Sequence, residues 1–204
     1  MRYTGPKARL CRREGVNLFG SPKYQKVMAR RASVPGAQSG KRMSKISEFG
    51  KQLREKQKAK RIFCLSEKQF KKYFEKASRK PGVAGDNLLF ALEHRFDNVL
   101  YRSGFAMTRM QARQFASHGL FLLNGRRVDV PSIEVKVGDV IEARPKTKKS
   151  PILKSIFDEL ENHNAPKWLK VDRTKMTIEV IGKPELAETE VVVNAQLIVE
   201  FYSR

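Results

Sequence analysis

The sequence predicts an α+β protein, in which a mainly helical, basic N-terminal part precedes two helices and a small antiparallel sheet. Helix-capping patterns with apolar residues at helical spacing recur between residues 47 and 118. The apolar residues then fall in short alternating runs around Asn124-Gly125, the dipeptide most typical of a tight β-hairpin. The 204 residues allow one or two modest domains, and a hydrophobic content of 40% is enough for a core.

Four helices are expected before residue 119. The first covers about 47–61, and the others begin after the candidate caps Ser66, Asp86 and Thr108 and end at Pro81-Gly82, Ser103-Gly104 and His118-Gly119. The first helix has only Phe49 and Leu53 as large apolar residues, so we expect it to lie on the surface.

The strands are expected after residue 119. They are the run 120–123, the segment after Asn124-Gly125 with Val128 and Val130, the alternating segment 133–137, the segment 140–143 and the segment 176–181. Ser150-Pro151 opens one more helix, and the segment 194–202 suits a helix slightly better than a strand.

Residues 1–45 are rich in Gly, Pro, Ser, Lys and Arg, and Ser33–Gly40 has the composition of a loop. Such a segment buries too little apolar surface to order itself in water. We therefore expect an extended basic arm that folds against its partner.

The net charge of +21 favours a polyanionic partner. Residues 1–61 hold 18 basic and 3 acidic residues, residues 94–150 hold 11 and 5, and residues 151–204 hold 7 and 9. The attraction is therefore concentrated in the N-terminal third, with a second focus in the middle. No apolar run is long enough to cross a membrane and no secretory signal opens the chain, so we expect a reduced, cytoplasmic setting.

The sequence contains no pattern typical of an enzyme or a metal site. The three histidines lie in separate segments, and the phosphate-binding loops and the nucleophile and metal motifs of known enzymes are missing. Cys11 and Cys64 are too few for a structural zinc site, which usually needs four Cys or His ligands. We expect no catalytic residue, no metal and no cofactor.

The helix after Thr108 and the hairpin that follows it indicate a nucleic-acid interface. Arg109 and Arg113 should lie on the surface away from the apolar side of this helix, and Arg126 and Arg127 extend the basic charge onto the hairpin. Arginine side chains and a helix N-terminus suit phosphate oxygens. The cations of helix 47–61 surround that helix, which fits insertion between strands of a folded RNA better than docking in one groove.

Several motifs resemble one known family. Segments Arg95–Phe105, Thr108–Gln114 and Asn124–Val128 resemble the RNA-binding domain named after small-subunit ribosomal protein four. The segments Arg2–Lys7 and Leu10–Gly15, with the terminal Ile198–Arg204, resemble the ends of that bacterial ribosomal family. The likeness covers essentially the whole chain.

The resemblance implies a structural protein of the 30S subunit that binds 16S ribosomal RNA first, nucleates assembly of the body and supports decoding accuracy. It implies contacts with small-subunit proteins five and three and a place near the channel through which mRNA enters. Many family members bind zinc through four N-terminal cysteines. Here only Cys11 remains, with Arg9 in the other position of the pair, so the chain resembles the zinc-free branch.

The resemblance also implies the division of the chain. We expect a basic arm over 1–45, a helical domain over 46–93 that is completed by about 182–204, and an inserted RNA-binding domain over 94–181 with its core in 94–150. The candidate RNA-binding residues are Arg2, Tyr3, Lys7, Arg12, Arg13, Lys51, Arg54, Lys56, Lys58, Arg61, Arg102, Thr108, Arg109, Arg113, Gln114, Ser117, His118, Asn124, Gly125, Arg126 and Arg127.

Two other functions stay open on sequence grounds. An RNA-modifying enzyme can carry the same binding domain, although it needs a further catalytic domain for which little chain remains. A regulator that binds its own mRNA would use the same RNA-binding residues.

Overall fold

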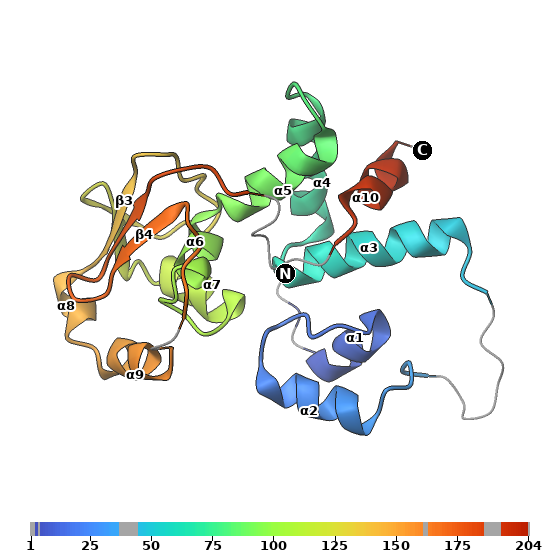
Figure 1. Cartoon of the computed structure of the whole chain (residues 1–204), viewed down its shortest axis with the longest axis horizontal. Helices are drawn as coiled ribbons and strands as arrows, with labels where there is room; N and C mark the ends of the chain where they lie inside the picture. Colours follow the sequence, from blue (N-terminus) through green and yellow to red (C-terminus); the bar gives the residue numbers. More distant parts are fainter. Residues whose placement is uncertain (1–2, 4, 37–44, 161–162, 186–192, 204) are drawn as a thin grey trace. The chain divides into compact units, whose positions relative to one another are not determined.

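A computed structural model describes residues 3, 5–36, 45–160, 163–185 and 193–203 (Figure 1). The chain divides into two compact units. Unit 1 contains Met1–Gly85 and Val191–Arg204, and unit 2 contains Asp86–Glu190. The division falls at the start of a helix, whereas the sequence predicted a boundary at 93/94.

The helices of unit 1 are α1 (Lys7–Glu14), α2 (Pro22–Arg30), α3 (Glu48–Ile62), α4 (Glu67–Ser78) and α10 (Ala195–Tyr202). Helix α5 (Ala84–Glu93) begins at the boundary. Unit 2 continues with α6 (Phe96–Arg102), α7 (Arg109–Ser117), β1 (Phe121–Leu123), β2 (Arg126–Val128), β3 (Val140–Ala143), α8 (Pro145–Lys148), α9 (Pro151–Glu159), β4 (Leu169–Asp172) and β5 (Thr177–Val180).

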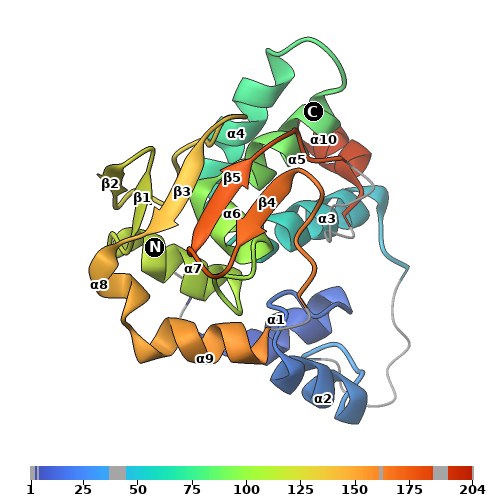
Figure 2. The ribbon, with the colours of Figure 1, turned by 60° about the vertical axis from the view of Figure 1, so that its left-hand side comes forward.

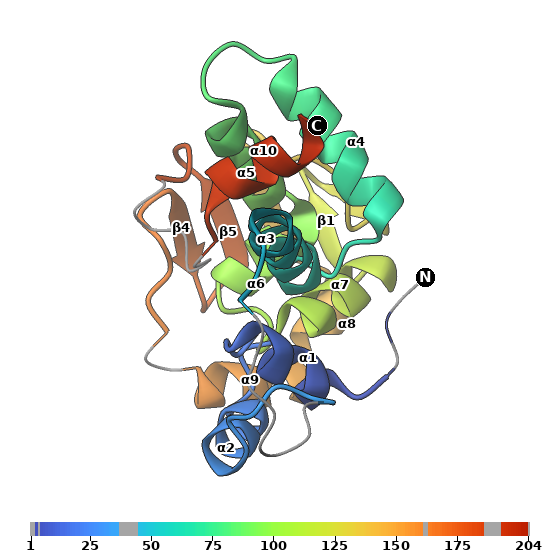
Figure 3. The same ribbon diagram turned by 90° about the vertical axis from the view of Figure 1, so that its right-hand side faces the viewer.

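The C-terminal helix α10 packs against α3 and α4, as Figure 3 shows. The ring of Tyr202 stacks on Phe74 with centroids 4.6 Å apart, and Ile198 is fully buried. The capping box predicted at Ser66 forms, which fixes where α4 starts. The prediction that the C-terminal segment completes the helical part is therefore confirmed.

Helix α3 differs from its prediction as a surface helix, because one of its faces is buried. That face carries Gln52, Lys56, Ala59 and Ile62. The amide nitrogen of Gln52 donates to Glu200 of α10 at 2.9 Å, so its N–H group is paired inside the unit. A search for apolar periodicity misses such a face because half of its residues are polar.

The predicted extended arm is wrong for the described part of residues 1–45, because two short helices form there. Gly15 adopts a left-handed conformation, with a φ of 69°, and ends α1. Cys11 and Leu18 are buried, and the side chain of Arg12 donates to the carbonyl oxygen of Ser33 at 2.6 Å. Residues 37–40 of the predicted loop lie outside the described residues.

Unit 2 is built on one antiparallel sheet with the strand order β2-β1-β3-β5-β4. Helices α6 and α7 cover one face of this sheet (Figure 2). The core between them includes Phe96, Leu100, Phe121, Ile141 and Ile178, all fully buried. The predicted class, with a helical N-terminal part and an inserted small sheet, is confirmed.

One predicted strand does not form, and one strand that forms was not predicted. The alternating segment 133–137 makes only an isolated bridge, between Glu134 and Arg95, and forms no strand. Strand β4 was not predicted, although it pairs with β5 along its length. In the described ranges, no helix has the length and apolar character that crossing a membrane requires.

Candidate nucleic-acid interface

Helix α7 presents a polar side to solvent because its other side fills the core of unit 2. The hydroxyl oxygen of Thr108 accepts from the backbone N–H of Gln111 at 3.2 Å and caps the helix. Ala112, Phe115 and Ala116 are buried, so the helical period turns other residues outward. The exposed residues of this helix and its C-cap include Gln114, Ser117 and His118.

The hairpin tip is held by Asn124. Asn124 and Gly125 both have positive φ, 50° and 76°, as a type I′ turn requires. The amide of Asn124 donates to a carboxylate oxygen of Asp139 at 2.8 Å and accepts from the backbone N–H of Val140 at 2.9 Å. Asn124 was predicted to bind RNA, but both ends of its side chain already hold the turn against the β3 segment.

Arg127 connects the hairpin to the end of α7. A Cβ built on Gly119 would lie 2.5 Å from Nε of Arg127, so the guanidinium group rests directly against the backbone of Gly119. Gly119 has a φ of 62° and follows His118, the C-cap of α7. We call Gln114, Ser117, His118, Arg126 and Arg127 the α7–hairpin face. All five are exposed.

A buried polar network holds Arg102 of α6 and Arg109 at the start of α7. Arg102 is 5% exposed, and its Nε lies 3.6 Å from Glu93. The amide of Asn98 donates to the same carboxylate at 2.7 Å and accepts from Nε of Arg109 at 2.9 Å. The Arg109 guanidinium also lies 4.3 Å from the centre of the Tyr101 ring.

Arg113 is tied to the same region through Asp97. Arg95, which is 1% exposed, donates to both carboxylate oxygens of Asp97, at 3.0 and 2.7 Å. Nη1 of Arg113 lies 3.9 Å from that carboxylate. The expectation that Arg109 and Arg113 are plain surface residues is therefore wrong, because both are half-buried and joined to buried polar groups.

The predicted RNA-binding cations of α3 all have carboxylate partners in unit 1. Lys51 pairs with Glu48, Lys58 with Glu55, Lys56 with Glu67, and both Arg54 and Arg61 with Glu14. Lys56 is 6% exposed and lies 4.3 Å from the centre of the Phe201 ring, so it stabilises the helix packing. Because these cations are paired, α3 offers less positive charge to an RNA than the sequence suggests.

Glu14 lies in a buried position between α1 and α3. Its side chain is 1% exposed and accepts from Nη1 of Arg54 at 3.2 Å. Burial raises the pKa of Glu14, and the two arginines oppose that rise. Burial also lowers the pKa of Arg61. The carboxylate thus joins the N-terminal helix pair to the long helix.

The N-terminal candidates divide into paired and exposed residues. Lys7 lies 5.8 Å from the centre of the Phe19 ring, and Arg12 is bonded to Ser33. Tyr3 and Arg13 are exposed, and Arg2 lies outside the described residues.

Helix α2 carries basic residues that sequence reasoning missed. Lys23, Lys26 and Arg30 are all exposed, and their spacing of three and four residues places them on one helix face. The spacing is visible in the sequence, but the sequence predicts an extended arm here, in which this spacing defines no helix face.

The cysteines and histidines do not gather. Cys11 is buried, which raises the pKa of its thiol, and Cys64 is half-buried. Within the described ranges, no three His, Cys, Asp or Glu side chains come close enough together to hold a metal ion.

The fold and the α7–hairpin face define the class of an RNA-binding protein with a small antiparallel-sheet domain. Residues 95–141 match the S4 domain, and residues 2–93 match the ribosomal protein S4/S9 N-terminal domain. The chain belongs to the uS4 family of small-subunit ribosomal proteins, a structural family and not one of enzymes.

Relatives cover the chain from end to end. Small ribosomal subunit protein uS4 of Syntrophomonas wolfei is 48% identical over 100% of this chain and 99% of its own length. The proteins of the same name from Solidesulfovibrio magneticus and Thermodesulfovibrio yellowstonii are 47% and 48% identical over the same shares of both chains.

Proposed function

We propose that this protein is a structural component of the small ribosomal subunit, works in the cytoplasm, and binds 16S ribosomal RNA through the α7–hairpin face. The observation that carries the RNA-binding part is the position of Arg126 and Arg127. Both are exposed on the edge strand β2, and neither has an acidic partner in the part of the chain that the structure describes. Free guanidinium groups on a rigid hairpin suit phosphate oxygens.

The surrounding structure makes this face rigid. Arg127 rests on Gly119, the turn is held through Asn124, and Arg144 donates to the carbonyl oxygen of Gly119 at 3.1 Å. A face that is already ordered loses less conformational entropy when it binds. The basic stripe of α2, with Lys23, Lys26 and Arg30, supports a second contact with the same RNA.

The finer roles follow from the family resemblance. We propose that the protein binds the RNA early and nucleates assembly of the body, and that it supports decoding accuracy. We also propose contacts with small-subunit proteins five and three, and with mRNA near the channel through which it enters. Cross-linking of assembled subunits, followed by mass spectrometry, tests these neighbours.

The first prediction concerns the α7–hairpin face. Changing Arg126→Glu together with Arg127→Glu should weaken binding to 16S RNA at least tenfold, since two phosphate contacts become repulsive. The slope of log K against log salt concentration should also become shallower by about two, one for each lost phosphate contact. Filter binding at several potassium concentrations, with bulk tRNA as competitor, measures both quantities.

The matched control is Lys68→Glu with Lys72→Glu on α4. Both lysines are exposed, and the change in net charge is the same. If the control weakens binding as much as the hairpin variant, the protein acts as a general polycation and the proposed face is wrong. A transcript of the protein's own leader, used in the same assay, tests the regulatory alternative.

A further inference from the structure

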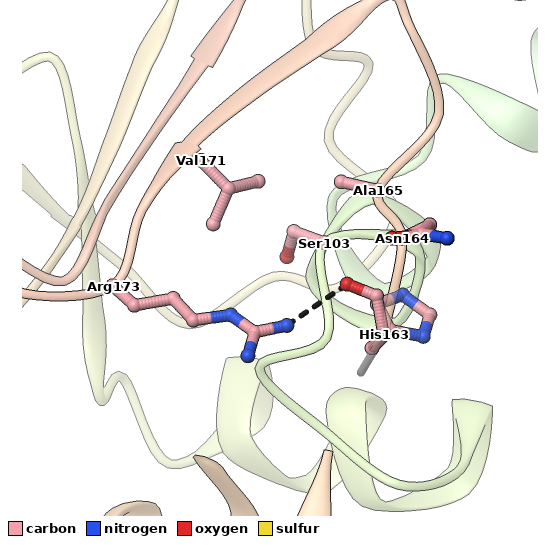
Figure 4. Close-up of a pocket in the computed structure, with 6 residues that line it drawn as sticks. All are labelled: Ser103, His163, Asn164, Ala165, Val171 and Arg173. Carbon is pink, nitrogen blue, oxygen red and sulfur yellow. Dashed lines mark hydrogen bonds between the residues drawn. The ribbon is translucent and has the colours of Figure 1, made fainter. Parts of the chain in front are cut away.

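A pocket lies in unit 2, at the edge of the sheet opposite to β2. Its volume is about 440 Å³, and Figure 4 shows its lining. Ser103 follows α6, His163–Ala165 precede β4, and Val171 and Arg173 come from β4 and the turn after it. Because β2 and β4 are the two edge strands, this pocket and Arg126 lie at opposite edges of the sheet.

The polar atoms of the pocket offer both donors and acceptors. Nη2 of Arg173 donates to the carbonyl oxygen of His163 at 2.9 Å, which brings the guanidinium group to the pocket (Figure 4). Nε2 of His163 lies 3.0 Å from the carbonyl oxygen of Arg102. A carbonyl only accepts, so Nε2 carries the proton, and in the neutral ring Nδ1 is an acceptor.

The remaining walls add a smaller polar group and an apolar side. The hydroxyl of Ser103 donates to the carbonyl oxygen of Leu100 at 3.1 Å, which leaves its oxygen as an acceptor. Val171 and Ala165 supply apolar surface (Figure 4). Donors, acceptors and an apolar wall in a pocket of this size are typical of a site for a small organic group.

The charge around the pocket favours an anionic ligand. Residues 163–175 hold four basic side chains and one acidic one, while the rest of 151–204 holds three basic and eight acidic. Of these cations, Lys170 pairs with Glu179 and Lys175 with Asp172, and Arg173 is the one that lines the pocket. None of the lining residues carries a carboxylate.

We propose that this pocket binds a single unstacked ribonucleotide of the bound RNA, with its base against Ala165 and Val171 and its phosphate near Arg173. The inference rests on the proposed RNA-binding function and adds a further RNA contact to it. Specific recognition of RNA depends largely on bases that are splayed out of a stack, and a pocket with an apolar wall can accept such a base. One compact unit would then hold two RNA segments, one at each edge of its sheet.

The test titrates the full-length protein with each of the four nucleoside 5′-monophosphates and, separately, with inorganic phosphate. Backbone amide signals of Asn164, Val171 and Arg173 are followed by NMR. We expect saturable shifts with at least one nucleotide and none with phosphate at the same concentration. Ala165→Phe fills the pocket without changing the charge and should abolish the shifts.

A second variant keeps the test decisive if the first one does not fold. Arg173→Gln retains a donor for the carbonyl of His163 but removes the charge, and should weaken nucleotide binding at least fivefold. Lys175→Gln is the matched control, since this side chain is 78% exposed and does not line the pocket. It should bind the nucleotide as the unchanged protein does.

Three results would overturn the proposal. Equal shifts with phosphate alone would make the pocket an anion site, and equal shifts with a hexaglutamate peptide would make it a peptide site. Lack of any shift, in a protein that still binds 16S RNA, would refute nucleotide binding at the pocket and leave the proposed function intact. Failure of the proposed function is recognised separately: the Arg126→Glu and Arg127→Glu changes would then leave binding to 16S RNA unaltered.

Discussion

At the scale of single residues, the buried network around Asn98 determines which arginines of unit 2 are free. Asn98 is 2% exposed and lies between Glu93 and Arg109. Its amide donates to Glu93 and accepts from Arg109. An amide can do both at once, whereas a carboxylate or an ammonium group cannot. Arg109 is thus fixed within the fold at the start of α7, while Arg126 stays exposed to solvent.

The second prediction follows from this network. Asn98→Ala removes the acceptor for Arg109 and a donor to Glu93, whose side chain is 1% exposed. Hydrogen bonds to charged groups contribute about 1.5–3 kcal/mol each, so the free energy of unfolding should fall by about 3 kcal/mol. Urea denaturation measures this loss.

Gln114→Ala is the control for that experiment. Gln114 is exposed on α7, the helix that packs against the one carrying Asn98, and a surface change of this kind should alter stability by less than about 0.5 kcal/mol. Equal losses of unfolding free energy in the two variants would show that the hydrogen bonds of Asn98 contribute no more to stability than an exposed side chain does.

The residue types of the network were visible in the sequence, but their partners were not. Arg102, Arg109 and Arg113 were all predicted to bind RNA. Their acceptors come from other elements, at the end of α5 and within α6. Sequence spacing within one helix cannot show such contacts, and it therefore counted buried arginines as surface ones.

At the scale of elements, one carboxylate of α4 joins α10 to α3. Glu67 accepts from Lys56 at 2.8 Å, from Lys60 at 2.9 Å and from the hydroxyl of Tyr202 at 2.9 Å. Partial burial opposes ionisation of Glu67, but these three donors outweigh it and hold its pKa at about 2. Burial and the same carboxylate raise the pKa of Tyr202.

The third prediction is a pH dependence of unit 1. The pKa of Glu67 is lower in the folded protein than its ordinary value of 4.5. Its contribution to stability is therefore complete above pH 4.5 and is lost as the pH falls from 4.5 towards 2. The denaturation midpoint should fall as the pH is lowered from 6 to 4 and then to 3. Glu67→Gln should make this decline shallower.

Glu75→Gln is the matched control, because Glu75 lies on the same helix and is 4.0 Å from Lys71 in an exposed pair. Exposed pairs contribute little, so this variant should keep the original slope. A slope that changes equally in both variants would assign the effect to net charge and not to the docking of α10.

The elements themselves were predictable where their signals are local. The caps at Ser66 and Thr108 and the Asn124-Gly125 turn are set by neighbours within four residues, and all three form as expected. Strand β4 carries no such signal and exists because it pairs with β5. The burial of α3 also depends on a distant segment, α10.

At the scale of the whole molecule, the chain contains two separate hydrophobic cores. Ile198 is fully buried in unit 1, and Ile178 is fully buried in the sheet core of unit 2. Unit 1 is discontinuous in sequence, since its last helix arrives only after unit 2 has been completed. The first unit therefore cannot complete its core until the C-terminus is present.

The fourth prediction tests whether the cores are separate. Ile198→Ala should cost about 2–5 kcal/mol, as cavity formation in a core does. We expect calorimetry to show a lower unfolding temperature for unit 1 alone, with the signals of unit 2 unchanged. Ile178→Ala should have the reverse effect. A single transition that moves equally in both variants would show that the units unfold as one.

The sequence alone determined the class of fold, the polyanionic partner and the hairpin, because caps and turns depend on residues close together in the chain and net charge depends on composition alone. The tertiary structure decided which of the many cations are available. Glu14, Glu67, Glu93 and Asp97 pair with cations far from them or on other elements, and they leave Arg126 and Arg127 exposed. The physical reason is that the pairing of a charge depends on distance in space, which separation along the chain does not specify.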